Sequence, residues 1–240
     1  DSEIETIRKN GGDIIISFGG SGGRELATVI EDEDELYNAY KSVIDYYKLS
    51  WIDLDIEGDV LKLNENANIN RNKVMLRLKN EYPNLILAYC LGAEHTTGIS
   101  NAGIKVLKHA KKIGLQVDVV NVMAMDFSRK ETPDGDTKMG QYAIDTAKVA
   151  YEQVNEIGFK NTKIGITPMI GKNDHIQQIF TLNNAMEVLE FSQNNEWVRL
   201  LSFWALNRDN GDGGDTDETS NKYSSIEQEE FAFTNIFKNF

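Results

Sequence analysis

Short apolar runs alternate with longer, helically patterned stretches along most of the chain. The runs are rich in β-branched residues and nearly continuous in apolar character, which is typical of strands covered on both faces, as in parallel sheets. They predict six strands, at residues 13–18, 51–57, 85–91, 117–125, 163–169 and 198–206.

Between these runs, apolar residues recur at the three- and four-residue spacing of amphipathic helices. One stripe covers residues 36–47, a second covers 104–113 and a third covers 139–154, and Gly114 and Gly158 follow two of them as C-terminal stops. This regular alternation of strand and helix predicts an α/β fold.

Near the C-terminus, residues 224–228 have the pattern of a helix cap, and an apolar stretch follows them. The sequence therefore predicts that a last helix begins within 224–228.

The pattern leaves two α/β architectures open, a doubly wound sheet and a barrel. A doubly wound nucleotide-binding sheet requires a glycine-rich phosphate loop after its first strand. Residues 19–23 are glycine-rich and follow a predicted strand, but they lack the Lys-Ser/Thr ending of a P-loop. Glu25 also stands at the third glycine position of the dinucleotide-binding pattern, so the indication of a phosphate site is weak.

Composition narrows the class of protein. The chain has 240 residues, 40% hydrophobic and 26% charged, as in one large globular domain, and no apolar run approaches the ~18 residues of a membrane span. The net charge of −13 argues against a nucleic-acid or anionic-membrane partner, because both require basic surface. The single cysteine, Cys90, excludes an intrachain disulfide, and its apolar run favours a core position.

Three acidic residues alternate with apolar ones at the end of the second predicted strand. Because alternate side chains of a strand share a face, Asp53, Asp55 and Glu57 line up about 6–7 Å apart from one to the next. Three like charges on a buried strand cannot all ionise cheaply, so at least one pKa must rise. A carboxyl group that stays protonated near neutral pH can act as a general acid. Glu57, at the C-terminal end of the strand, is the candidate catalytic acid.

A divalent metal site is the main alternative for this cluster, because hard cations also prefer grouped carboxylates. A solvated edge strand fits less well, since the residues between the carboxylates are apolar. The histidines, His95, His109 and His175, are scattered, which disfavours zinc and a histidine-assisted nucleophile. The acidic loop 209–218 could bind calcium, but its spacing does not match the twelve-residue calcium loop, and a solvated loop is favoured.

Residues 50–57 read S-W-I-D-L-D-I-E and resemble the D-x-x-D-x-D-x-E motif on the fourth strand of glycoside hydrolase family 18, the chitinases and their relatives. Residues 17–20 match the S-x-G-G motif of that family's third strand, and 121–127 match its sixth-strand pattern in part. Residues 165–174 and 201–209 resemble the last two strands of bacterial or archaeal chitinases. Several motifs in the expected order therefore resemble this family, which implies a TIM (β/α)8 barrel.

The resemblance implies a retaining hydrolase without an enzymic nucleophile, because the N-acetyl group of the substrate attacks the anomeric carbon and forms an oxazolinium ion. In that mechanism Glu57 protonates the leaving oxygen and then activates water. Asp55 orients the acetamido group, and Asp53 supports Asp55. The implied ligand is chitin or a chitooligosaccharide, with no cofactor and no metal.

The resemblance also implies a sugar-binding surface. Trp204 would lie under the sugar at the cleavage point, Met123, Met125 and Asp126 would line the same subsite, and Gly20 would let the backbone pass close beneath it. Core packing is the ordinary role of a strand tryptophan or methionine and stays open for these residues. Asp126 is harder to explain by packing, because it is a charge at the end of an apolar strand.

Two positions depart from the family pattern. Ser50 stands where the family has its first Asp, and Met125 stands where many members have a Tyr that binds the acetamido oxygen. A thioether is at best a weak acceptor, so another donor is needed. Tyr89, on the neighbouring strand, is the candidate.

The number of predicted strands indicates an incomplete barrel. A complete barrel has eight strands, and if residues 17–20 lie on the third, the first two lie upstream. We therefore expect residues 1–240 to be strands three to eight of a family 18 catalytic domain. An open barrel exposes strand edges, so completion by a missing N-terminal segment or a companion chain is expected.

The resemblance further predicts a secreted protein whose signal peptide is not in this chain. Two alternatives to a chitinase stay open. One is a catalytically silent chitin-binding lectin, and the other is a different N-acetylglucosamine-specific glycosidase.

Overall fold

The chain forms two compact units. A computed structural model describes residues 2–132, 135–175 and 177–240. The first unit comprises residues 1–90, 101–119 and 157–159, and the second comprises residues 91–100, 120–156 and 160–240. Strand β3 (Ile86–Glu94) begins in the first unit and ends in the second.

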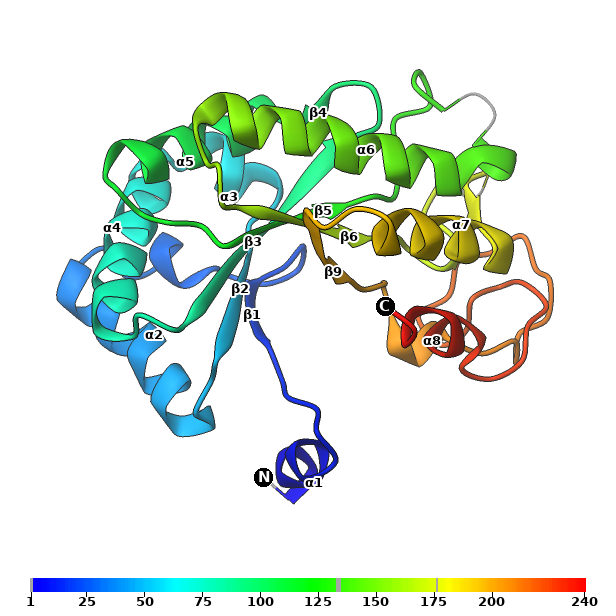
Figure 1. Cartoon of the computed structure of the whole chain (residues 1–240), viewed down its shortest axis with the longest axis horizontal. Helices are drawn as coiled ribbons and strands as arrows, with labels where there is room; N and C mark the ends of the chain where they lie inside the picture. Colours follow the sequence, from blue (N-terminus) through cyan, green and yellow to red (C-terminus); the bar gives the residue numbers. More distant parts are fainter. Residues whose placement is uncertain (1, 133–134, 176) are drawn as a thin grey trace. The chain divides into compact units, whose positions relative to one another are not determined.

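The first unit is a parallel sheet with helices packed on it (Figure 1). β1 (Ile16–Gly19) pairs in parallel with β2 (Trp51–Asp55), and β2 pairs in parallel with the first residues of β3. Helix α4 packs against both α2 and α5. The helical elements of this unit are α1 (Ser2–Lys9), η1 (Leu26–Thr28), α2 (Glu33–Tyr47), α3 (Gly58–Leu63), α4 (Glu65–Glu81) and α5 (Asn101–Lys112).

Strand alternation decides which side chains enter the core of this unit. Ile52, Leu54 and Ile56 are fully buried, whereas the acidic residues between and after them are partly exposed. The apolar face of β2 therefore supports the helices, and the acidic side chains occupy the opposite face.

The second unit contains the remaining strands except for Val119, the first residue of β5. These strands are β4 (Gly98–Ile99), β5 (Val119–Met123), β6 (Lys163–Thr167), β7 (Gly171–Lys172), β8 (Ile179–Phe180) and β9 (Val198–Leu201). β6 pairs in parallel with β9, β4 pairs with the end of β3, and β7 and β8 form a short antiparallel ribbon. Its helical elements are α6 (Gly135–Ile157), α7 (Leu182–Gln193), η2 (Leu206–Arg208) and α8 (Ala232–Phe237). Helix α7 packs against both β9 and α8.

All six predicted strands are confirmed, most of them shorter than the apolar runs. β2 ends at Asp55, and Glu57 is instead the residue that precedes helix α3. The three predicted helical stripes lie on α2, α5 and α6. β1 is the edge strand of the first unit, with β2 as its neighbour in the strand order. The expectation of two further strands upstream stays a prediction.

The predicted start of the last helix is wrong, because α8 begins at Ala232. Ser224 and Ser225 are fully buried and extend a loop instead, in which the Ser225 hydroxyl donates to the carbonyl of Glu218 (2.6 Å). Tertiary hydrogen bonds therefore override the local capping pattern.

The N-terminus of α8 is capped from a distant segment by Asp209. Its carboxylate accepts hydrogen bonds from the backbone N–H groups of Phe233 (3.0 Å) and Thr234 (2.8 Å), and Asp209 is buried. The favoured interpretation of the whole loop 209–218 as solvated is therefore wrong at its first residue.

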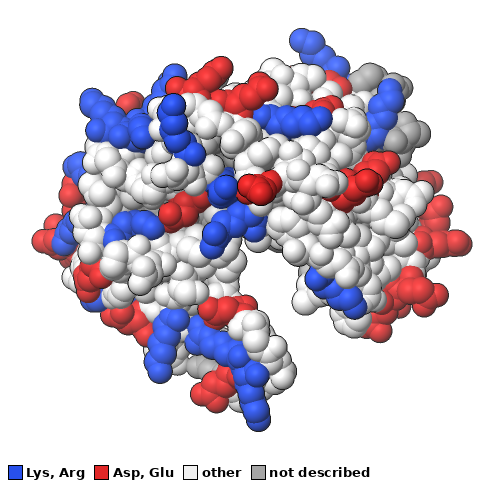
Figure 2. All heavy atoms as spheres, in the orientation of Figure 1, with Lys and Arg blue, Asp and Glu red and all other residues white. Residues whose placement is uncertain are grey.

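Charge is mixed on one face of the molecule (Figure 2). Figure 2 shows basic and acidic side chains interspersed on the face in view. Within the described residues, no helix has the length and apolar character needed to cross a membrane.

Candidate active site

The three predicted catalytic carboxylates lie together in the first unit. β1 and β3 flank β2, with Ser17 opposite Asp53 and Cys90 opposite Asp55 in the strand register. The Ser17 hydroxyl donates to Asp53 Oδ2 at 2.6 Å. The first residue of the S-x-G-G motif thus contacts the first matching carboxylate of the β2 motif.

Two carboxylate oxygens in this cluster have no partner. Asp53 Oδ1 and Asp55 Oδ1 are buried and accept no hydrogen bond from the described residues. Buried polar atoms in folded proteins are normally hydrogen-bonded, because leaving one unpaired costs about 1–3 kcal/mol. The arrangement is typical of a site whose polar groups are directed at a ligand.

The pKa values of the cluster are raised, as the sequence predicted. Burial raises the pKa of Asp53 to about 6. Burial, followed by repulsion from Glu57 and Asp53, raises the pKa of Asp55 to about 7. Burial also raises the pKa of Glu57, although hydrogen bonds from Asp55 and from the Ser21 N–H act in the opposite direction. Burial therefore raises these pKa values more than the repulsion between the carboxylates, on which the prediction was based.

Asp55 and Glu57 share a hydrogen bond that raises the pKa of Asp55 and lowers that of Glu57. Because the two carboxyl groups interact, the protonation of one depends on that of the other.

Glycines in the loop after β1 allow the close approach of this loop to β2. A Cβ atom on Gly19 would lie 2.1 Å from the Asp55 carbonyl oxygen, and Gly19 has a φ of +113°. The N–H of Gly20 donates to the same carbonyl oxygen at 2.9 Å. A Cβ on Gly20 would lie 3.9 Å from Asp55 Oδ2, so Gly20 is placed beside the predicted catalytic carboxylates. The glycines therefore allow the contact between this loop and β2. A phosphate site would need the N-terminus of an α-helix after the loop, but only a three-residue 3₁₀ turn follows it.

Tyr89 does not lie with the carboxylates, which corrects its prediction as a donor to the substrate. It is opposite Leu54 in the register, on the helix-facing side of the sheet, and is fully buried. Its hydroxyl donates to Asn72 Oδ1 on α4 at 2.6 Å. A shift of one residue along a strand moves a side chain to the other face of the sheet. The sequence of one strand does not reveal its register with the neighbouring strand.

Cys90 is buried, as predicted, but it lies on the carboxylate side of β3. Its thiol shares a hydrogen bond with Asp55, and burial raises the pKa of Cys90 well above the ordinary thiol value. Sequence reasoning missed this contact, which the register opposite Asp55 determines.

In the second unit, the predicted aromatic residue Trp204 is 55% exposed, which argues against a role in core packing. Its backbone is fixed by hydrogen bonds from its N–H to the Pro168 carbonyl (2.9 Å) and from Ile170 N–H to its own carbonyl (3.0 Å). The peptide bond from Trp204 to Ala205 is cis. Met123 and Met125 are half-buried.

Asp126 is held in a defined position in the second unit. It adopts a left-handed backbone conformation, with φ of +48°. Its Oδ1 accepts from the backbone N–H of Asp174 at 2.8 Å, and its own N–H donates to Asn173 Oδ1 at 3.2 Å. Burial, followed by repulsion from Asp174, raises the pKa of Asp126.

A polar cluster on the strands of the second unit was not predicted. Thr167 Oγ1 donates to Asn121 Oδ1 at 2.8 Å and shares a hydrogen bond with Ser202 Oγ at 2.6 Å. The sequence signal that could have predicted this cluster is the presence of polar residues in otherwise apolar strand segments.

The metal alternative gains no support from the part of the chain that the structure describes. There, no group of three or more His, Cys, Asp or Glu residues is arranged to hold a metal ion. In the acidic loop, Asp215 and Asp217 form ion pairs with the buried Lys172, at 3.0 and 3.5 Å.

Similarity to known proteins agrees with this geometry. No protein-family profile matches the chain. It is 27% identical to a probable bifunctional chitinase/lysozyme of Escherichia coli (strain K12), over 100% of this chain and 28% of that protein. It is 28% identical to endochitinase 11 of Metarhizium anisopliae, over 87% of this chain and 42% of that protein. The chain thus spans less than half the length of these curated relatives.

A solved structure covers nearly the whole chain. Catalytic-site mutants of active domain 2 of a thermostable chitinase from Pyrococcus furiosus, complexed with chito-oligosaccharides, superpose with a TM-score of 0.85 and 27% identity, over 99% of this chain and 75% of that one. The chain has the TIM-barrel type of fold of these chitinase domains. Its sequence and its carboxylate motif are similar to those of glycoside hydrolase family 18 chitinases.

Proposed function

We propose that this domain hydrolyses β-1,4-linked N-acetylglucosamine polymers, with Glu57 as the catalytic acid. The observation that carries the proposal is the neighbouring pair of partly buried carboxyl groups, Asp55 and Glu57, because burial raises the pKa of both and that of Asp55 to about 7. A carboxyl group in that state can protonate a glycosidic oxygen. The Pyrococcus furiosus relative, complexed with chito-oligosaccharides, supports the same class of ligand.

In the proposed first step, the proton of the pair lies on Glu57 and passes to the glycosidic oxygen as its bond to the anomeric carbon breaks. The acetamido oxygen of the same sugar forms a bond to that carbon and gives an oxazolinium ion. Asp55 accepts a hydrogen bond from the acetamido N–H and offsets the positive charge. Asp53, held by Ser17, supports Asp55 from the next position on β2.

In the second step, Glu57 removes a proton from water, and the water oxygen attacks the anomeric carbon as the oxazolinium ring opens. Two displacements at one carbon give net retention. Since the first step needs one proton on the pair, hydrolysis is expected to fall as pH rises above about 7, the pKa of Asp55.

The test is cleavage of soluble chitooligosaccharides by the wild-type domain and by Glu57→Gln. General acid–base catalysis contributes ~10²- to 10⁴-fold, so Glu57→Gln should lose activity by about that factor. Glu65→Gln, an exposed substitution on α4, is the matched control and should retain full activity. Equal activity of Glu57→Gln and wild type would overturn the role of Glu57. Proton NMR of the first products distinguishes retention from inversion.

A second candidate is a different N-acetylglucosamine-containing substrate, because the Escherichia coli relative is named a chitinase/lysozyme. Release of soluble fragments from peptidoglycan, in parallel with the chitooligosaccharide assay, separates the two. Binding of chitooligosaccharides without cleavage by the wild type would instead favour a lectin.

Secretion is part of the proposal, since insoluble chitin is accessible only outside the cell that degrades it. Fractionation of cells that express the natural protein would test it, and confinement to the cytoplasm would contradict it.

A further inference from the structure

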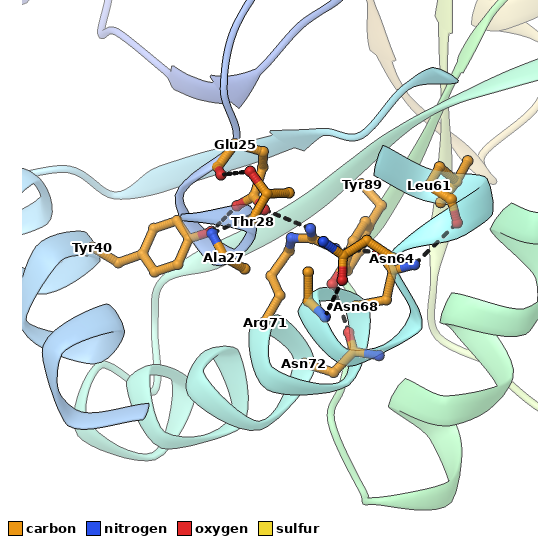
Figure 3. Close-up of polar contacts among 11 residues, drawn as sticks. Glu25, Ala27, Thr28, Tyr40, Leu61, Asn64, Asn68, Arg71, Asn72 and Tyr89 are labelled. Atoms are coloured by element: carbon orange, nitrogen blue, oxygen red, sulfur yellow. Dashed lines mark hydrogen bonds and ion pairs between the residues drawn. The ribbon is translucent and has the colours of Figure 1, made fainter. Parts of the chain in front are cut away.

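Outside the carboxylate cluster, the first unit buries a complete ion pair. Glu25 follows the glycine-rich residues 19–23, called the glycine loop below. Arg71 lies on α4, and its Nη2 is 2.6 Å from Glu25 Oε2. The side chains of Glu25 and Arg71 are 2% and 0% exposed. Figure 3 shows Glu25 and Arg71 within a polar network that also includes residues of α2, α3 and α4.

The Glu25 carboxylate has one well-defined orientation. Its Oε2 also accepts the backbone N–H of Ala27 at 3.0 Å, and its Oε1 accepts the hydroxyl of Tyr40 from α2 in a short hydrogen bond. Charged hydrogen bonds from three elements fix both oxygens, and hence the end of the glycine loop.

Arg71 reaches a second segment on its other side. Its Nη1 donates to Asn68 Oδ1 at 2.7 Å, and Asn68 Nδ2 donates to the Leu61 carbonyl of α3 at 3.0 Å. Helix α3 begins directly after Glu57. The guanidinium of Arg71 thus holds two segments. One is the end of the glycine loop, through Glu25, and the other is helix α3, through Asn68.

The glycine loop contacts both catalytic groups. The Gly20 N–H donates to the Asp55 carbonyl oxygen, and the Ser21 N–H donates to the Glu57 carboxylate. The Glu25 side chain packs beneath the start of this loop, with its Cγ 3.7 Å from where a Cβ on Gly19 would lie.

A buried ion pair often adds no stability over apolar residues of similar volume, so stability alone does not explain its presence. We propose that Glu25 and Arg71 are positioning residues, which hold the glycine loop and α3 in the arrangement that sets Asp55 and Glu57 for reaction. The expected effect on kcat rests on the proposed function, whereas the expected effect on the arrangement of Asp55 and Glu57 does not.

The structural consequence is measured by ¹³C NMR titration of the Glu57 side-chain carboxyl. In Glu25→Gln the loop loses its charged anchor, so the Ser21 N–H no longer stabilises the Glu57 anion. The pKa of Glu57 should then rise by ~0.5–1 unit. Tyr40→Phe removes one hydrogen bond and keeps the ion pair, so it should fold and shift the same titration in the same direction by less.

The kinetic consequence is a loss of kcat with little change in KM, because ground-state sugar contacts are retained while reacting groups are misplaced. We expect a ~10- to 100-fold lower kcat in Glu25→Gln. Arg71→Lys, which keeps the charge but cannot reach Glu25 and Asn68 in the same way, should fall between Glu25→Gln and wild type.

Lys79→Met is the matched control, because Lys79 lies on the same helix and forms a partly buried ion pair with Asp118 (2.7 Å) away from the glycine loop. It should lower thermal stability and leave the Glu57 titration and kcat unchanged. If Glu25→Gln and Tyr40→Phe fold and leave the Glu57 titration as in wild type, or if Lys79→Met shifts it equally, the positioning role is wrong. If the wild type cleaves no chitooligosaccharide while the titration shifts as expected, the proposed function fails and the positioning role stands.

Discussion

Glu25 is a buried carboxylate and Asp55 a half-buried one in the same unit, and their surroundings are opposite. Glu25 has donors on both oxygens and an arginine as counter-ion, whereas Asp55 lies between two other acids and keeps Oδ1 unpartnered. Asp209, in the second unit, resembles Glu25, since it caps a helix with both oxygens occupied. Burial of a carboxylate therefore does not by itself indicate a catalytic site. Among the described residues, the unpartnered oxygen distinguishes Asp55, the proposed reactive group, from Glu25 and Asp209.

The largest expected difference between the two kinds of carboxylate is catalytic. Asp55→Asn should lower kcat/KM for chitooligosaccharides by ~10²- to 10³-fold, because a neutral amide offsets less positive charge in the transition state. Steady-state kinetics measures it. Asp59→Asn, an exposed substitution on α3, is the control. Activity of Asp55→Asn within a few-fold of wild type would show that Asp55 is not a working partner of Glu57.

The second largest difference is in stability, and it concerns the paired carboxylate. Arg71→Met leaves Glu25 buried without its counter-ion and should lower the free energy of unfolding by ~3–5 kcal/mol. The double variant Glu25→Leu/Arg71→Met should recover most of that loss, because no unpaired charge is left. Urea denaturation of both variants decides the point, and equal losses in the single and double variants would contradict it.

Removing the charge of Asp53, which lacks a counter-ion among the described residues and whose Oδ1 has no partner there, should raise the stability instead of lowering it. The pKa of Asp53 is raised to about 6 in the fold, so the folded state binds more protons than the unfolded state between about pH 4 and pH 6. Stability therefore falls as pH rises through that window. Asp53→Asn removes this loss and should stabilise the domain by ~1–2 kcal/mol at pH 7 and by little at pH 4. Urea denaturation at the two pH values measures the difference; destabilisation at pH 7 would mean that the hydrogen bond from Ser17 outweighs the cost of burying the Asp53 charge.

The smallest expected effect on stability concerns a single hydrogen bond, from Ser17 to Asp53. Ser17→Ala removes the donor that lowers the pKa of Asp53, so this pKa should rise further. The variant should lose ~0.5–1.5 kcal/mol at pH 7 and less at pH 4, where Asp53 is protonated. Ser42→Ala, on the exposed side of α2, is the control in the same denaturation series. A loss independent of pH would show that Ser17 does not stabilise the charged form.

The sequence alone determined the strand pattern and the carboxylate face of β2. Both follow from local periodicity: a period of two places Asp53, Asp55 and Glu57 on one face whatever the strand pairs with. The S-x-G-G motif was also visible in sequence, and the structure adds its contacts, from Ser17 to Asp53 and from Gly20 to Asp55.

The tertiary structure decided the partners of those residues. Tyr89 was predicted on the wrong face because the register between two strands is a long-range property, whereas Cys90, one residue further, lies beside Asp55. Glu25 looked in sequence like a defect in a glycine pattern, yet it pairs with Arg71, 46 residues away. Local patterns fix which way a side chain points within its own strand. Only packing between distant segments decides whether a buried charge meets a counter-ion, a helix end or an empty place for a ligand.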